Sequence, residues 1–379
     1  MDRWIAPELL FDGTVVQRGK ALQLSGGRVV KVADAPADAV AVTGLVTPGF
    51  VDLQVNGGGG IMLNTTPTHD GIAGILAAHR GLGTVAVMPT VITDHPDVLD
   101  KAADAAIAAK GLHGFVGLHI EGPHISVARR GTHAAQYVRP FDDRTMETVM
   151  RLRAQGIAVM ITLAPENATA TQVATLVQNG VVVSIGHTDA TAEELRILMA
   201  AGATCATHLF NAMSPMLGRA PGAVGAVINS DCYAGIICDG HHVADEIVGM
   251  AIRARPTAGR MMLVSDAMAT VGGPDEFTLY GQTIRLQDGR LVNEEGSLAG
   301  AHVTQALGVQ RLVVRTGTPL ETALAMATTV PADCMGRPDL GGLMGRGADD
   351  LVVLDADTLD YRGDLATALA TTAQSNAAQ

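Results

Sequence analysis

The sequence predicts an α/β fold, a closed (β/α)8 TIM-like barrel with a small β unit built from both ends of the chain. From Leu45 onward, short apolar runs alternate with Ala- and Leu-rich segments of helical period, which is typical of parallel βα repeats. Eight such runs occur, the number that closes a barrel, and polar residues gather at their C-terminal ends, where barrel enzymes carry their active sites. The same alternation also suits an open, doubly wound sheet.

The two ends of the chain show a different pattern, of short strands and turns. Residues 5–43 contain short strand-like runs with turns at Gly19 and at Gly26-Gly27, and residues 348–363 return to short strands that we expect to pair with the first set. We therefore predict residues 1–45 and 346–379 as the two parts of a small β domain and residues 46–345 as the barrel.

The eight barrel runs define the order of the central domain. The insertion at residues 273–300 alternates polar and apolar residues between Gly and Asp turns, so we expect hairpin strands that roof part of the pocket. Residues 319–335 have a helical pattern, and the tail after Asp364 is compatible with a helix. The runs begin near Val46, Thr84, Phe115, Ile157, Val181, Ala203, Tyr233 and Met261.

Composition narrows the class of protein. A net charge of −12 over 379 residues opposes binding to nucleic acid, and the longest basic stretch is only Arg129-Arg130. The four cysteines show no CxxC spacing, the first residues lack the apolar core of a signal peptide, and no apolar run reaches the ~18 residues of a membrane span. We expect a soluble cytoplasmic protein with no membrane partner.

Three candidate metal ligands stand at the ends of predicted strands three, five and six: Glu121, His187 and His208. Because parallel strands end at the same edge of a sheet, these side chains should converge there. One carboxylate and two imidazoles suit zinc or another divalent cation with one position open to water. The alternative is that each is a hydrogen-bonded polar residue of the barrel rim.

Two further residues near these ligands each have two possible roles. His119 lies two positions before Glu121 on the same strand face and competes as a ligand, but we expect it to lie deeper and to hydrogen-bond within the barrel. Asp266 ends strand eight, where a carboxylate can take a proton from a water and later donate it to a leaving nitrogen. Its alternative role is to cap the following helix.

Several phrases carry a family resemblance. GLHIEGPHISVARRGTH, IGHTDA, THLFNAM, CDGHHV and SDAM, in this order between about residues 45 and 355, resemble the N-acetylglucosamine-6-phosphate deacetylases of the amidohydrolase superfamily. The resemblance implies a barrel with a small β-sandwich formed by both termini and a homodimer. It also implies that Glu121, His187 and His208 bind the metal and that Asp266 is the general base and acid.

The resemblance also implies a substrate site. Arg219 and His242 are expected to reach the sugar phosphate partly across the dimer interface, and His133 to polarise the acetyl carbonyl. Alternatively, Arg219 is a surface arginine and His133 an exposed loop histidine. Of His241 and His242, only the spacing after Asp239-Gly240 favours the second. The implied positions are Thr132, His133, Asn211, Ala212, Arg219, Asp239, Gly240, His241, His242, Leu298, Ala299 and Gly300.

One departure from the wider superfamily concerns strand one, which commonly ends in HxH there. Here the positions hold Gln54 and Asn56, and amides bind divalent metals poorly compared with imidazole. We therefore predict one divalent ion per subunit, with Zn²⁺ as first candidate and Fe²⁺, Co²⁺ and Mn²⁺ as alternatives.

The predicted reaction is hydrolysis of the N-acetyl group of N-acetylglucosamine 6-phosphate to glucosamine 6-phosphate and acetate. Three alternatives stay open: a deacetylase for another N-acetylhexosamine phosphate such as N-acetylgalactosamine 6-phosphate, a cyclic-amide hydrolase, and a barrel that binds a sugar phosphate without catalysis. The joint presence of Glu121, His187, His208 and Asp266 argues against the last.

Overall fold

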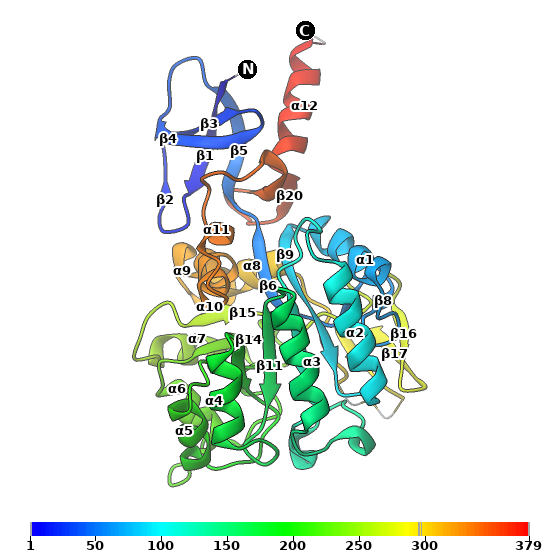
Figure 1. Cartoon of the computed structure of the whole chain (residues 1–379). Helices are drawn as coiled ribbons and strands as arrows, with labels where there is room; N and C mark the ends of the chain where they lie inside the picture. Colours follow the sequence, from blue (N-terminus) through cyan, green and yellow to red (C-terminus); the bar gives the residue numbers. More distant parts are fainter. Residues whose placement is uncertain (1, 295, 297, 378–379) are drawn as a thin grey trace.

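A computed structural model describes residues 2–294, 296 and 298–377. Its centre is an eight-stranded parallel sheet that curls into a barrel (Figure 1). Each predicted apolar run supplies one strand, which confirms the (β/α)8 prediction over the doubly wound sheet. The strands are β6 (Phe50–Val55), β9 (Thr84–Ile92), β10 (Leu118–Glu121), β11 (Val159–Leu163), β12 (Val182–Ile185), β13 (Cys205–Ala206), β14 (Tyr233–Ile236) and β15 (Met261–Leu263).

The barrel closes between its first and last strands. The amide of Asp266 donates to the carbonyl of Gln54 at 3.0 Å, and the amide of Asn56 donates to the carbonyl of Ala267 at 2.9 Å. The seam is reinforced by Asp52, a fully buried carboxylate that accepts the amide hydrogens of Gln54 and Ser265 at 3.2 Å each. These bonds hold the two strand ends that carry Gln54 and Asp266 side by side.

Helices cover the outside of the barrel because each repeat has one apolar helix face to bury. Local signals start several of them: α4 and α5 each begin with a capping box, Thr169 with Gln172 and Thr191 with Glu194. The helices that follow the eight strands are α1 (His69–Arg80), α2 (Pro96–Ala108), α3 (Asp143–Ala154), α4 (Ala170–Gln178), α5 (Ala192–Ala200), α6 (Gly222–Ile228), α7 (Asp245–Ala254) and α8 (Gln305–Thr316).

Strands from both ends of the chain form a second, seven-stranded sheet, as the pairing prediction required. Strand β5 (Val40–Pro48) pairs with β19 (Leu351–Leu354), which pairs with β20 (Tyr361–Asp364). The predicted boundary after residue 45 falls inside β5, and the separate β domain stays a prediction. The other strands are β1 (Arg3–Phe11), β2 (Val16–Gln17), β3 (Lys20–Ser25) and β4 (Arg28–Asp34).

The chain returns from the barrel to this sheet through short helices, and the tail packs on it. The predicted helix at residues 319–335 is two helices, α9 (Leu320–Ala327) and α10 (Thr329–Cys334), because Thr328 leaves helical geometry at φ −132° and ψ −81°. Helices α11 (Pro338–Gly341) and η3 (Ala348–Asp350) follow. The tail is the helix α12 (Leu365–Ala377), whose Leu365 and Leu369 are buried.

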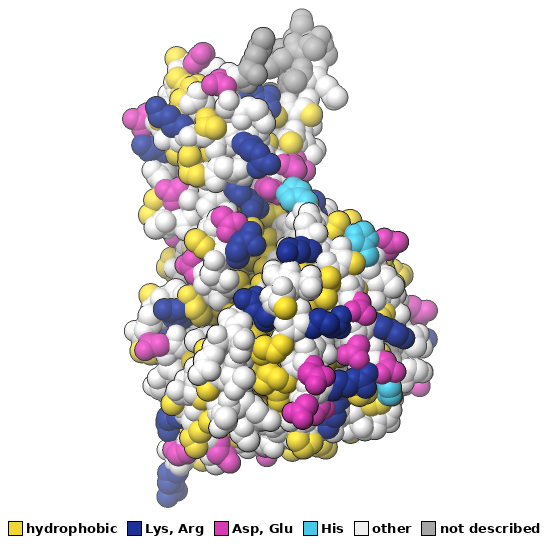
Figure 2. All heavy atoms as spheres, viewed as in Figure 1, with side chains coloured by type: hydrophobic (Ala, Val, Ile, Leu, Met, Phe, Trp, Pro, Cys, Tyr) yellow, Lys and Arg dark blue, Asp and Glu magenta, His cyan; other side chains and the backbone are white. Residues whose placement is uncertain are grey.

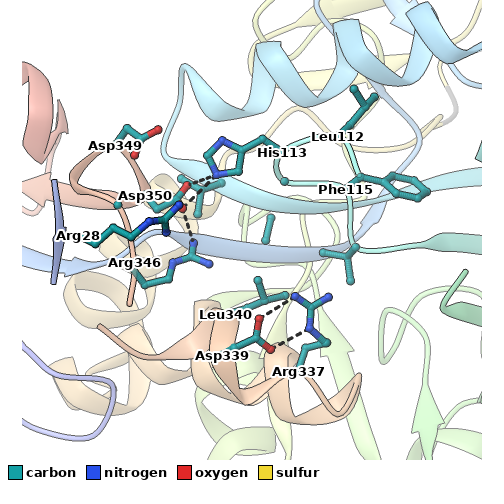
Figure 3. A pocket seen from close by; sticks show the side chains of 15 residues that line it. Arg28, Leu112, His113, Phe115, Arg337, Asp339, Leu340, Arg346, Asp349 and Asp350 are labelled. Atoms are coloured by element: carbon teal, nitrogen blue, oxygen red, sulfur yellow. Dashed lines mark hydrogen bonds and ion pairs between the residues drawn. The ribbon is translucent and has the colours of Figure 1, made fainter. Parts of the chain in front are cut away.

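A polar cavity of about 520 Å³ lies between the terminal sheet and the N-terminal end of the barrel strands (Figure 3). The carboxylate of Asp350 lies at its centre. Its oxygens are 2.9 Å from a side-chain nitrogen of Arg80, 3.0 Å from one of His113 and 3.7 Å from one of Arg346. These ion pairs join the chain entering β19 to α1 and to the loop before β10, so they fix the two sheets relative to each other.

The opposite, C-terminal rim carries the insertions that surround the site. The predicted hairpins at residues 273–300 are present as β16 (Glu276–Leu279), β17 (Gln282–Gln287) and β18 (Arg290–Val292). The rim also carries the small β7 (Gly57–Gly58) and β8 (Ile61–Met62) pair and the 3-10 turns η1 (Val127–Arg129) and η2 (Ala135–Tyr137).

The surface of the barrel is mixed in charge. Over α2 and α3, acidic and basic side chains alternate (Figure 2), and Arg144 bridges Asp97 and Asp100 there. None of the helices formed by the described residues is both long enough and apolar enough to cross a bilayer. A cytoplasmic location and the absence of a nucleic-acid partner stay predictions.

The buried carboxylate of Asp52 gives a testable pH dependence of stability. Burial raises its pKa from 3.8 to about 6, against the opposing hydrogen bonds from Ser265 and Gln54. The folded chain therefore holds this proton more tightly than the unfolded chain, and stability falls as pH rises from about 4 through 6. The difference between 3.8 and about 6 corresponds to about 3 kcal/mol.

We expect the free energy of unfolding of the wild type to fall by up to about 3 kcal/mol relative to Asp52→Asn between pH 4 and pH 7, because Asn carries no titrating proton. Urea unfolding of both proteins across this range measures the difference. A difference that does not change with pH would contradict the assignment.

Candidate active site

The candidate catalytic side chains lie at the C-terminal rim, where the strands deliver them. Glu121 is the last residue of β10, whereas His187, His208 and Asp266 lie two to three residues beyond β12, β13 and β15. These three have positive φ angles of 49°, 29° and 50°, which L-residues rarely adopt. Left-handed backbone at three such positions marks the rim as a site that tertiary packing holds against local preference.

These left-handed turns also explain why the sixth barrel strand ends early. The apolar run from Ala203 to Phe210 suggests a long sixth strand, but β13 contains only Cys205–Ala206. His208 and Phe210 both take positive φ, so the chain leaves strand geometry early and turns His208 toward the barrel axis.

Glu121, His187 and His208 meet in a compact triangle. Oε1 of Glu121 lies 3.1 Å from Nε2 of His187 and 3.0 Å from Nε2 of His208, and the two Nε2 atoms are 3.0 Å apart. All three residues are at most 4% exposed. Burial alone would raise the pKa of Glu121, but the two imidazoles lower it well below its ordinary value.

The atoms of this triangle are of the type that binds a metal. His187 Nδ1 lies 2.9 Å from the backbone carbonyl of Arg129, an acceptor, so Nδ1 carries the hydrogen and Nε2 of the neutral ring presents a lone pair. That lone pair faces a carboxylate oxygen and a second imidazole nitrogen. Acceptor atoms this close repel unless a proton or a metal ion lies among them, and a carboxylate with two imidazoles fits a divalent ion.

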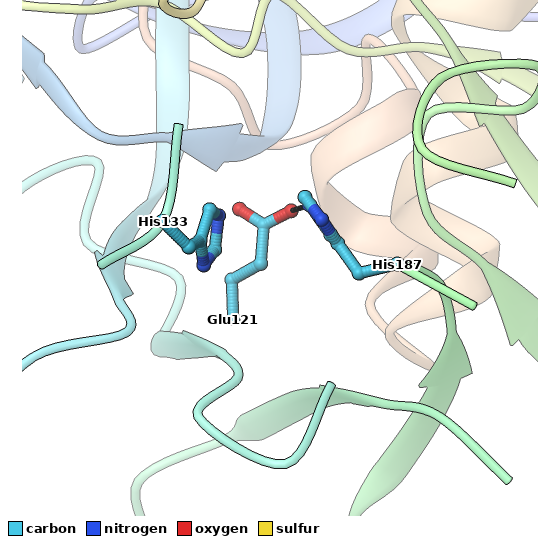
Figure 4. Close-up of side chains that lie close together, drawn as sticks. All are labelled: Glu121, His133 and His187. Atoms are coloured by element: carbon cyan, nitrogen blue, oxygen red, sulfur yellow. Dashed lines mark hydrogen bonds and ion pairs between the residues drawn. The ribbon is translucent and has the colours of Figure 1, made fainter. Parts of the chain in front are cut away.

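His133 stands on the other side of Glu121 from His187 (Figure 4). Ligand atoms of these three residues all lie within 4.8 Å of one another. His133 Nδ1 pairs with Thr93 Oγ1 at 2.7 Å, which leaves Nε2 for another partner. Burial, together with the neighbouring His187, holds the pKa of His133 well below its ordinary value, so the ring is neutral.

Two amides separate the carboxylates of this rim. Nε2 of Gln54 donates to both oxygens of Glu121, at 3.1 and 3.2 Å, and to Oδ1 of Asp266 at 3.1 Å. Nδ2 of Asn56 donates to the same Asp266 oxygen at 2.7 Å. The amide hydrogens of Gln54 and Asn56 therefore fill the space between the carboxylates of Glu121 and Asp266.

Asp266 combines burial with a nearby like charge. Burial and the charge of Glu121 raise its pKa to about 6, and His208, His242 and the hydrogen bond from Asn56 oppose the rise. A carboxyl with a pKa near neutrality exchanges protons readily, which a general base that later acts as an acid requires.

His119 lies beneath the site and bonds inside the barrel, as predicted. Its Nε2 pairs with Thr162 Oγ1 at 2.7 Å and its Nδ1 with the carbonyl of Leu53 at 3.1 Å. Both ring nitrogens are occupied within the barrel, and burial lowers the pKa of His119 to about 4.

The pocket above the triangle has a volume of about 180 Å³. His242 lines it and is held by Asp239, whose Oδ2 lies 2.6 Å from Nδ1 of His242. Burial alone would raise the pKa of Asp239, but His242 lowers it to about 2. The predicted residues that line the pocket are Glu121, Thr132, His133, His187, His208, Asn211, Ala212, His242, Asp266, Leu298 and Gly300.

Other predicted residues lie elsewhere. His241 is exposed beside Gly289, and Ala299 is buried. Asp239 and Gly240 are outside the pocket lining, in the turn that holds His242. Arg219 is on an exposed turn closed by the backbone bonds between Leu217 and Ala220. His242 lines the pocket of its own chain, and the expected contribution of Arg219 and His242 across a dimer interface stays a prediction.

The sequence did not single out Ile92, Gly131 or Met268, which also line the pocket. Met268 closes the phrase SDAM, so its proximity to Asp266 was a usable signal. Ile92, the last residue of β9, has none, because an apolar residue at a strand end looks like core.

The sequence of this chain matches a known protein family. Residues 45–377 match the Amidohydrolase family. The chain belongs to the amidohydrolase family. The predicted family membership is thus confirmed, and so is the prediction that this chain is an enzyme. Its described residues include a set that could hold a metal.

Two relatives of this amidohydrolase are enzymes acting on amino-sugar phosphates. It is 40% identical to an N-acetylgalactosamine-6-phosphate deacetylase of Shewanella sp. strain ANA-3 over 83% of this chain and 80% of that protein. It is 35% identical to an N-acetylglucosamine-6-phosphate deacetylase of Haemophilus influenzae over 80% of each chain.

A solved structure is similar over nearly the whole amidohydrolase chain. It is an aspartate-to-alanine variant of N-acetyl-D-glucosamine-6-phosphate deacetylase from Mycobacterium smegmatis in complex with N-acetyl-D-glucosamine-6-phosphate. The TM-score is 0.87 and the identity 31%, covering 95% of this chain and 96% of that one.

Proposed function

We propose that this amidohydrolase removes the N-acetyl group from an N-acetylhexosamine 6-phosphate, with N-acetylglucosamine 6-phosphate as the first candidate substrate. The observation that carries the proposal is the buried triangle of Glu121, His187 and His208 beside Asp266. The names of the relatives support the substrate class. Because one relative, at 40% identity, is an N-acetylgalactosamine-6-phosphate deacetylase, that epimer is the second candidate.

The proposed chemistry divides among the residues of the pocket. Glu121, His187 and His208 would hold a divalent ion, with Zn²⁺ as first candidate, which would supply Lewis acidity when bound. Asp266 takes the proton of the attacking water and later gives it to the leaving nitrogen. His133, neutral and held by Thr93, donates from Nε2 to the oxygen on which negative charge develops.

We propose a single ion per subunit. The support is chemical: the amide of Gln54 directs its hydrogens at Glu121 and Asp266, and an amide nitrogen is a poor metal ligand. Metal analysis should therefore give about one ion per chain. Two fully occupied ions about 3.5 Å apart would overturn this part of the proposal.

We further propose that the enzyme is a homodimer in which Arg219 of one subunit contacts the substrate phosphate in the other. Among the described residues, none of those lining the pocket is Lys or Arg, although a phosphate needs cationic partners. Arg219 lies on an exposed turn with Met216 and Leu217, which are 47% and 61% exposed. Exposed apolar residues beside an exposed arginine suit a contact with a second copy.

Replacing Arg219 by Ala should raise KM for a phosphorylated N-acetylhexosamine by about 10- to 100-fold, because an ionic hydrogen bond to phosphate contributes about 1.5–3 kcal/mol. The KM for the unphosphorylated sugar should stay unchanged. Steady-state kinetics on both substrates measures the ratio. The matched control is Arg196→Ala, an exposed arginine on α5 paired with Glu193.

The test of the function is acetate release from a small panel: N-acetylglucosamine and N-acetylgalactosamine, each with and without the 6-phosphate, after chelation and re-addition of Zn²⁺, Fe²⁺, Co²⁺ or Mn²⁺. We expect activity only with metal, and a much higher kcat/KM for the phosphorylated sugars than for the unphosphorylated ones. Equal activity on both epimers would leave the reaction standing and broaden the substrate, whereas no acetate from any sugar would overturn the proposal.

A further inference from the structure

The turn that carries His187 is also the docking point of the loop that carries His133. The loop, residues 126–133, crosses the rim after β10, and the turn, residues 187–189, follows β12. Neither segment is regular structure over most of its length, so the contacts between them help to place both side chains.

Three hydrogen bonds join the two segments. The amide of Ser126 donates to the carbonyl of His187 at 2.8 Å, and Nδ1 of His187 donates to the carbonyl of Arg129 at 2.9 Å. Nε of Arg129 donates to Asp189 at 2.8 Å. Arg129 therefore orients the His187 ring through its backbone carbonyl and binds Asp189, in the same turn as His187, through its side chain.

The turn is fixed from its other side by Glu166, which lies after β11. One carboxylate oxygen accepts the hydroxyl of Thr188 and the other accepts the amide of Asp189, both at 2.7 Å. Thr188 is fully buried and also exchanges backbone bonds with Ala212 and Ser214 of the next loop. Glu166 thus braces a turn whose first residue, His187, has a left-handed backbone.

We propose that the Arg129–Asp189 ion pair, braced by Glu166, couples metal binding at His187 to the placement of the loop that carries Thr132 and His133. The inference rests on the proposed metal site. Arg129, Asp189 and Glu166 are positioning residues: they are outside the pocket lining and act through His187 and the loop.

The coupling follows from the direction of the His187 ring. An ion on Nε2 fixes the ring and with it the Nδ1 hydrogen that holds the Arg129 carbonyl. A docked loop in turn holds the ring ready for the ion. By linkage the two effects are equal in size. Because Arg129 and Asp189 are 37% and 48% exposed at the side chain, the expected effect of their pairing is about three- to fivefold.

The loop supplies its own reporter, because Arg129 and Arg130 are trypsin sites. Cleavage there, normalised to the remaining sites by mass spectrometry, should be slower in Zn²⁺-loaded wild type than after chelation. In Asp189→Ala, which keeps both sites, this Zn²⁺ protection and the Zn²⁺ affinity measured by chelator competition should each fall about three- to fivefold. Glu166→Gln should act in the same direction. Glu193→Ala, which removes an exposed carboxylate paired with Arg196, should behave as wild type.

The outcomes distinguish the proposed coupling from the proposed metal site. If Zn²⁺ binds normally and Asp189→Ala matches Glu193→Ala in both protection and affinity, the coupling is overturned and the proposed function is untouched. If neither wild type nor Glu193→Ala binds Zn²⁺, the proposed metal site fails, and the coupling with it.

Discussion

Asp266→Asn should lower kcat for deacetylation by about 10³-fold while leaving the bound metal in place, because the variant loses the group that moves the proton in both halves of the reaction. The amide oxygen of Asn can still accept the hydrogen bonds that Gln54 and Asn56 give to Oδ1 of Asp266, so the rim should keep its shape. The metal triangle contains no atom of residue 266.

The measurement is single-turnover acetate release together with metal content by elemental analysis. Asp97→Asn is the matched control, since Asp97 is an exposed aspartate of α2 paired with Arg144. A variant with near wild-type kcat would show that Asp266 is not the proton carrier. Loss of metal with loss of turnover would instead place Asp266 among the ligands.

Glu121→Gln should abolish stable metal binding and lower kcat/KM by at least about 10³-fold, because several kcal/mol of charge stabilisation leave with the ion. The Gln amide fills the same volume, and its hydrogens can satisfy the lone pair of His187 that otherwise faces the carboxylate. The variant is therefore expected to fold.

Metal content after dialysis and the melting temperature measure this prediction. His119→Asn is the matched control, because His119 lies on the same strand, is equally buried and bonds within the barrel. Retention of a full metal equivalent by Glu121→Gln would exclude Glu121 as a ligand.

The sequence could predict the barrel because parallel strands buried on both faces must be apolar throughout, and β9 is buried at all nine positions. It could also predict that Glu121, His187 and His208 share one rim, because parallel strands end at one edge. These inferences depend only on the order of the strands along the chain.

Distances and directions of side chains depended on the tertiary structure. The adjacent residues His241 and His242 are equal candidates by type, but Asp239 turns only His242 into the pocket. Likewise, Gln54 reads only as a missing metal ligand, whereas in the structure it is the donor that links Glu121 to Asp266. Such contacts join residues 67 and 212 positions apart, a separation that no local pattern reports.

By itself, then, the sequence determined the fold, the rim and the residue types available for chemistry, because burial and strand periodicity are local properties of the chain. Only the tertiary structure decided which atoms face one another: Nε2 of His187 and of His208 toward Glu121, the amides between the carboxylates, and Arg129 toward Asp189. The reason is that left-handed turns and side-chain hydrogen bonds at the rim are imposed by packing between distant segments, against the local preference of each residue.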